Sequence, residues 1–266
     1  MSFSYTADVT KKLSSIEKFL FLGLSAVTLM GFFWPFFVST RSQAHLAPWI
    51  LLAAAPLTLI SLAVTISRNK LDTKTIALLA TLAALIAAMR PLGAGAIGIE
   101  PMWFILILAA RIFGPYFGFI LGALSMFLSA LLTGGFGPWF NYQLFAAAWM
   151  GASVILIPRS LRGTREIGSL ALLALLDCEL FGIAMDLQFW PWSLGQSTQL
   201  SYKAGAPLQE NLDHFFTYHF TASMAWDIPR ALFTAALIVI TGPSVLNALR
   251  RAYVKAAFVA PVRFEK

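Results

Sequence analysis

Two apolar segments near the C-terminus carry polar and aromatic side chains at matched helical spacing. The two sets are Glu179, Asp186 and Trp190, and then His219, Trp226 and Arg230. In each set the successive intervals are seven and four positions, which at about 100° per residue predicts one shared helix face. Ionisable side chains inside a membrane are costly, and they point into a bundle interior or an aqueous cavity where they pair or bind a solute.

We therefore expect Asp186, Trp190, His219, Trp226 and Arg230 to contribute to a solute-binding site. Arg230 is also expected to neutralise Asp227 on its own helix or an acid on the neighbouring helix. For Arg230 and for Asp177, a structural ion pair without ligand contact is the alternative interpretation.

A third set of candidates follows a glycine-rich break in the apolar pattern. Residues 134–138 hold three glycines and a proline, which cannot continue a helix and predict a turn at a membrane surface. A purely structural turn would need the glycines but not the polar and aromatic residues that come directly after them. We expect a binding role for Trp139, Asn141, Tyr142 and Gln143, and for Trp149 on the helix that follows.

Several sequence signatures of enzymes are missing from the chain. There is no phosphate-binding loop, no HExxH and no GxSxG, so nothing predicts ATP hydrolysis or another catalytic activity. The single cysteine, Cys178, lies in an apolar run, and no Cys/His spacing indicates a metal site. The sequence thus predicts no enzyme, no metal and no cofactor.

The amino-acid composition indicates which fold class holds these residues in place. Of 266 residues, 59% are hydrophobic and only 12% are charged, with a mean hydropathy of +0.76. Soluble domains carry about a quarter charged residues, so membrane lipid must replace water around much of this chain. The fold class predicted is an all-α integral membrane protein.

Apolar runs predict about eight transmembrane helices. They cover residues 18–39, 47–67, 75–89, 101–113, 117–133, 141–158, 168–190 and 216–248. We divide the chain into an N-terminal two-helix hairpin at 1–74, a six-helix core at 75–251 and a cytoplasmic tail at 252–266.

The positions of the basic residues predict the orientation. With a cytoplasmic N-terminus, fourteen Lys and Arg fall on the inner side and only Arg41, Arg90 and Lys203 fall on the outer side. Both termini are therefore expected in the cytoplasm, and Arg111 is expected to snorkel at an inner helix end. Because the basic residues are not gathered in one patch, the net charge of +7 indicates topology and not a nucleic-acid partner.

Six of the eight tryptophans map to predicted outer ends or outer loops. An ordinary interfacial belt decorates both membrane surfaces, so this asymmetry favours an aromatic cavity that opens outward. The alternative is that tyrosines form the belt at the inner surface.

Small residues recur every fourth position on the segment 75–89. Ala80, Ala84 and Ala88 predict a flat helix face that a second helix can approach closely. This face can serve a partner protein or packing within the chain's own bundle, and the spacing alone does not separate the two.

The ordered set of motifs resembles the substrate-specific (S) component of energy-coupling factor (ECF) transporters over about residues 75–251. The resemblance is carried by the alanine-striped helix, the loop 90–101, Ala109–Pro115, Gly122–Ser125, Gly134–Trp139 and Gly242–Arg251. The segments Phe189–Trp192 and Trp226–Arg230 are most similar to an actinobacterial branch assigned to cobalamin or its precursors.

The resemblance implies a six-helix core in the bacterial plasma membrane that captures a vitamin-like molecule from outside. It also implies that the core docks, through Ala80, Ala84 and Ala88, on a coupling membrane protein attached to two ATPase subunits. The hairpin at 1–74 is an addition to this pattern. An autonomous secondary transporter and a structural assembly protein are the alternative functions.

Overall fold

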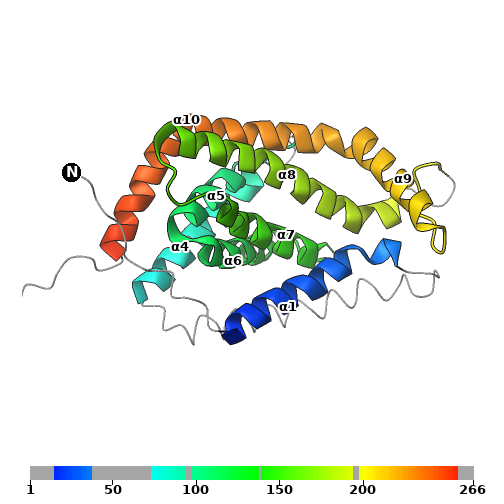
Figure 1. The fold of residues 1–266 in the computed structure, drawn as a ribbon, viewed down its shortest axis with the longest axis horizontal. Coiled ribbons are helices and arrows are strands. Elements are labelled where there is room, and N and C mark those ends of the chain that lie inside the picture. Colours follow the sequence, from blue (N-terminus) through cyan, green and yellow to red (C-terminus); the bar gives the residue numbers. More distant parts are fainter. Residues whose placement is uncertain (1–14, 38–72, 94–96, 138, 194–197, 257–266) are drawn as a thin grey trace, which may run out of the picture.

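The computed structural model describes residues 15–37, 73–93, 97–137, 139–193 and 198–256, and every regular element within these ranges is helical. Figure 1 shows α8 and α10 side by side along the long axis of the molecule. In chain order the elements are α1 (Ser15–Phe32), η1 (Trp34–Phe36), α4 (Thr73–Met89), η2 (Arg90–Gly93), α5 (Met102–Phe113), α6 (Pro115–Thr133), α7 (Phe140–Ala152), η3 (Ser153–Leu156), α8 (Gly163–Ser193), α9 (Leu208–Tyr218), η4 (His219–Ser223) and α10 (Met224–Ala256).

Four described segments are long and apolar enough to cross a membrane, which confirms the all-α membrane fold. They are Lys74–Gly93, Pro115–Thr133, Gly163–Ser193 and Leu208–Val254, and shorter apolar helices lie at Met102–Phe113 and Phe140–Leu156. The apolar run at 47–67 and the end of the tail lie outside the described residues. The total of eight spans and the division of the chain at residue 74 stay predictions.

Helix α5 forms the centre of the bundle. Its residues from Met102 to Ala110 are all buried, as expected for a helix that is apolar on every side. Helices α4, α6, α7, α8 and α10 all pack against it. At 12 residues it is about 18 Å long, which is shorter than the hydrocarbon layer of about 30 Å.

Helices α6 and α7 approach each other closely because both carry glycine at the crossing. A Cβ atom added at Gly122 would lie 2.2 Å from the carbonyl oxygen of Ala147, and one added at Gly151 would lie 2.0 Å from that of Gly118. Gly118 and Gly122 form a small-xxx-small pair, which lets helix backbones touch in lipid. This contact fixes where α7 presents its polar residues.

The predicted turn between α6 and α7 is confirmed. Helix α6 ends at Thr133, and Gly134 follows in the left-handed conformation with φ of 65°. This conformation favours glycine because a Cβ atom is strained there. Helix α7 begins at Phe140, so the glycine-rich segment separates the two helices.

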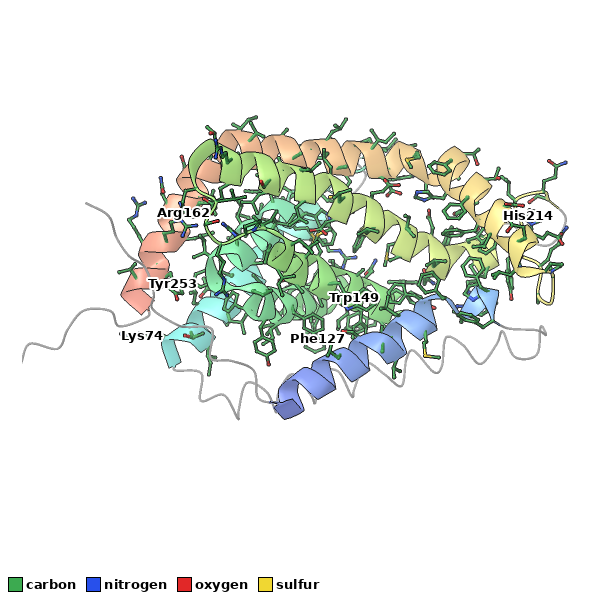
Figure 2. All side chains as sticks on the ribbon, viewed as in Figure 1. Lys74, Phe127, Trp149, Arg162, His214 and Tyr253 are labelled. Atoms are coloured by element: carbon green, nitrogen blue, oxygen red, sulfur yellow. The ribbon has the colours of Figure 1, made fainter. Side chains whose placement is uncertain are left out.

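The two ends of the bundle can be followed in Figure 2. Lys74, Arg162 and Tyr253 lie toward one end, and His214 lies at the opposite end. We call these the Arg162 end and the His214 end. Residues that the charge bias assigns to the cytoplasm thus share one end, and the orientation of the molecule in the membrane stays a prediction.

A buried ion network ties three helices together near the Arg162 end. Arg111 of α5 donates from Nε to Glu166 Oε1 of α8 at 2.8 Å, and Arg250 of α10 donates from Nη2 to Glu166 Oε2 at 2.6 Å. The Arg111 side chain is only 5% exposed and also donates to three carbonyl oxygens of residues 157–161. The expectation that Arg111 snorkels is wrong, because a buried carboxylate lies within its reach.

Candidate functional site

His219 lies between two carboxylates of α8, near the middle of that helix. Its Nδ1 is 2.7 Å from Asp186 Oδ2, and its Nε2 is 2.8 Å from Glu179 Oε1. The imidazole is 1% exposed. The predicted shared face of Glu179 and Asp186 is confirmed, because both carboxylates bind the same ring.

A second ion network continues from this histidine toward α5. Arg230 donates from Nη1 to Asp227 Oδ1 and from Nε to Glu100 Oε2, the latter at 3.0 Å. Trp103 Nε1 also donates to Glu100, and the Arg230 guanidinium lies 5.2 Å from the ring centroid of Phe181. The expected pairing of Arg230 with Asp227 is confirmed.

We call Glu100, Glu179, Asp186, His219, Asp227 and Arg230 the charged cluster. Glu100 precedes α5, two acids come from α8, and the rest come from η4 and α10. Ser223 of η4 donates from Oγ to Asp186 Oδ1 at 2.7 Å. Both Asp186 oxygens are therefore engaged.

A π-helical turn, η4, sets which residues of α10 face the charged cluster. In a regular α-helix His219 and Trp226 would share a face, but a π turn accommodates one extra residue and shifts the register by one. Asp227 is consequently 2% exposed while Trp226 is 48% exposed. The expectation that His219 and Trp226 share a face is wrong, and Asp227 takes the place of Trp226.

Gly182 makes room for Asp227 on the facing helix. A Cβ atom at residue 182 would lie 2.1 Å from Asp227 Oδ2. The buried carboxylate therefore lies directly against the backbone of α8. Any side chain at residue 182 would displace Asp227 from the charged cluster.

Trp190 belongs to a packed aromatic group toward the His214 end. Its ring centroid lies 5.3 Å from that of Phe215, 5.5 Å from Tyr202 and 6.2 Å from Phe36. Its Nε1 donates to the carbonyl oxygen of Leu200 at 2.6 Å, and the side chain is almost fully buried. Trp190 thus lies among side chains of this chain, on the helix that carries Asp186.

Two of the α7 candidates lie against α1. The ring of Tyr142 meets that of Phe32 edge-on at 4.6 Å. Trp149, labelled in Figure 2, lies 5.3 Å from Phe32 and donates from Nε1 to Ser25 Oγ at 3.3 Å. The N-terminal helix therefore covers this side of α7.

The remaining candidates on and before α7 differ in exposure. Asn141 is buried, whereas Trp139 is 43% exposed. Gln143 accepts a hydrogen bond from Arg90 Nη2 at 2.8 Å, and Arg90 Nη1 also donates to Ser129 Oγ at 3.3 Å.

The structure brings together Asp186, His219 and Arg230 in the charged cluster and places the α7 candidates and Trp190 in separate surroundings. Sequence reasoning missed Glu100, because nothing near it in the chain indicates that Arg230 would reach it. Asp177, for which a structural ion pair was an alternative, instead accepts a hydrogen bond from Ser153 Oγ at 2.6 Å.

The alanine stripe of α4 faces away from the bundle. Ala80, Ala84 and Ala88 are exposed, whereas Ala83 and Ala87 are fully buried. The two rows lie on adjoining sides of the helix, and the exposed row is left uncovered by the described part of the chain.

Comparison with known proteins identifies a family for this chain. A family model described as ECF-type riboflavin transporter, S component, matches residues 70–251, and no curated protein or solved structure matches significantly. Such S components are multi-pass plasma-membrane transport subunits and not enzymes, in agreement with the apolar helices described above. The resemblance noted in the sequence is thereby confirmed, and the chain belongs to the family of ECF-type riboflavin transporter S components.

Proposed function

We propose that this chain captures a vitamin or related micronutrient at the outer face of the plasma membrane and delivers it inward. Delivery would use a coupling membrane protein and two ATPase subunits, with both termini of this chain in the cytoplasm. The observation that carries the proposal is the family match over residues 70–251. The charged cluster supports it, because ionisable groups at membrane depth mark solute pathways.

Two solutes are the leading candidates. Riboflavin comes first, because the matched family is named for it. Cobalamin or a precursor comes second, because the segments Phe189–Trp192 and Trp226–Arg230 resemble a branch assigned to that vitamin. A polar solute could also satisfy the Tyr202 hydroxyl, which is buried and has no hydrogen-bond partner among the described residues.

Purified protein should bind one of these vitamins, and Asp186→Ala and Arg230→Ala should each weaken binding at least tenfold. Removing a buried hydrogen-bonded charge commonly costs about 2 kcal/mol or more, and 1.4 kcal/mol corresponds to tenfold. The measurement is equilibrium titration with riboflavin and with cobalamin in detergent. Asp213→Asn, an exposed acid of α9, is the control, and wild-type affinity in both test variants would reject the site.

The exposed alanine row should be the docking face. Ala84→Trp is expected to abolish co-purification with the coupling protein and its ATPases, while the vitamin Kd stays unchanged. A large ring at this position prevents close helix approach. Ala236→Trp, an exposed alanine of α10, is the matched control.

If Ala84→Trp still formed the complex normally, the docking face would have to lie on another surface of the chain. Uptake into vesicles that contain this chain alone would instead favour an autonomous secondary transporter.

A further inference from the structure

The charged cluster holds more negative than positive charge. Its four carboxylates face one guanidinium and one imidazole. With the carboxylates ionised, even a protonated His219 leaves two negative charges in excess. Excess charge is expensive inside a membrane, so a cation bound among these residues would stabilise the arrangement.

Three residues of the cluster are spaced as metal ligands. Glu179, His219 and Asp227 each offer one ligand atom, and these atoms all lie within 4.8 Å of one another. In a tetrahedral site with bonds of about 2.1 Å, ligand atoms are about 3.4 Å apart. Side-chain adjustments of about 1 Å would thus be enough to enclose a metal ion.

Asp227 provides an independent sign of a missing partner. Its Oδ1 accepts from Arg230, but Oδ2 is buried without any hydrogen-bond partner among the described residues. The residue is 2% exposed, and Oδ2 lies 4.0 Å from His219 Nδ1, on the side of the cluster. A buried carboxylate oxygen is rarely left unsatisfied.

Asp186 orients the His219 imidazole in the way that a carboxylate orients a histidine ligand in a metal site. It accepts from Ser223 through Oδ1 and faces His219 Nδ1 through Oδ2. A histidine that ligates a metal usually donates its other ring N–H to a carboxylate, which fixes the tautomer. His219 Nε2 is then available to the metal beside Glu179.

We propose that Glu179, His219 and Asp227 bind one divalent first-row transition-metal ion, with Asp186 as the residue that orients His219. Imidazole with carboxylates suits Zn²⁺ and its neighbours better than Mg²⁺ or Ca²⁺. The metal takes the place of the proton on Nε2, which leaves the imidazole neutral and the cluster with three excess negative charges. A divalent ion reduces this excess from three negative charges to one. Three protein ligands leave a fourth position open to water or to a donor atom of a solute.

Sequence reasoning predicts no metal site because the ligands are far apart in the chain. Glu179 and His219 are separated by 40 positions, and the π turn is needed to align His219 with Asp227. No short ligand spacing exists for a motif to detect.

The test uses the full-length chain in detergent, stripped with EDTA and titrated with ZnCl₂ alone. Calorimetry and elemental analysis should give one Zn²⁺ per chain. Glu179→Gln and Asp227→Asn should each weaken Zn²⁺ binding at least tenfold, and Asp186→Asn should weaken it about 10–100-fold, as for other residues that orient a ligand. Glu179 is 32% exposed, so its amide variant is the one least expected to disturb folding.

The control is His214→Gln, because His214 Nδ1 lies 2.9 Å from the Ser201 carbonyl oxygen, which is not part of the charged cluster. It should bind Zn²⁺ like the wild type. Absence of saturable binding in the wild type, or unchanged affinity in both Glu179→Gln and Asp227→Asn, would overturn the proposal. Because no vitamin is present, the result does not depend on which solute the chain transports.

Discussion

Gly122→Val should leave little correctly assembled protein. The new Cβ atom would meet the backbone oxygen of Ala147 at 2.2 Å, and a backbone atom cannot rotate away as a side chain can. Overpacking of a tight contact typically costs 1–3 kcal/mol and sometimes more, and we expect about 3 kcal/mol or more because α6 and α7 would have to separate. The measurement is the melting temperature and monodisperse yield in detergent.

The matched control for this prediction is Gly168→Ala on α8. A Cβ atom there has no neighbour within 4 Å, and alanine is the better helix former by about 1 kcal/mol. This variant should be as stable as the wild type or slightly more stable. Equal melting temperatures for Gly122→Val and the wild type would contradict the close crossing of α6 and α7.

Glu166→Ala should destabilise the bundle by about 3–5 kcal/mol, the cost of leaving a buried charge without its partner. Both Arg111 and Arg250 donate to this carboxylate. The Arg111 side chain is 5% exposed, so water cannot replace the lost partner. Thermal unfolding in detergent would measure the effect.

Arg162→Ala is the control for the Glu166 network. The Arg162 side chain is 60% exposed and lies 3.9 Å from Glu166, and exposed ion pairs contribute about 0–1 kcal/mol. Its melting temperature should stay close to that of the wild type. If the two variants were equally stable, Glu166 would not hold α5, α8 and α10 together.

Hydropathy predicted the helices well because lipid requires every crossing segment to be apolar and to satisfy its own backbone. The core segment predicted at 75–89 is α4 at Thr73–Met89, and the segment predicted at 101–113 is α5 at Met102–Phe113. Helix α8 extends to Gly163–Ser193 from a predicted 168–190, because Glu166 in its first turn is satisfied by arginines and not by solvent.

The charged cluster could be predicted only in part. Helical periodicity placed Glu179 and Asp186 on one face, because α8 keeps a regular register through both residues. Periodicity failed between His219 and Trp226 because the backbone changes its hydrogen-bond pattern within η4. Glu100 was not predicted as a member of the cluster, because 130 positions separate it from Arg230 in the chain. Helical periodicity relates only residues of the same helix.

The π turn gives this part of the chain an unusual tolerance to the loss of one residue. Asp227 lies eight positions after His219, and the extra residue of the π turn lets the two share a face. Deleting one residue between 219 and 223 would leave them seven positions apart, which is the spacing that shares a face in a regular α-helix. The same deletion in the regular part of α10 would instead rotate the flanking segments by about 100° relative to each other, so a deletion is expected to preserve the pairing of His219 with Asp227 only within the π turn.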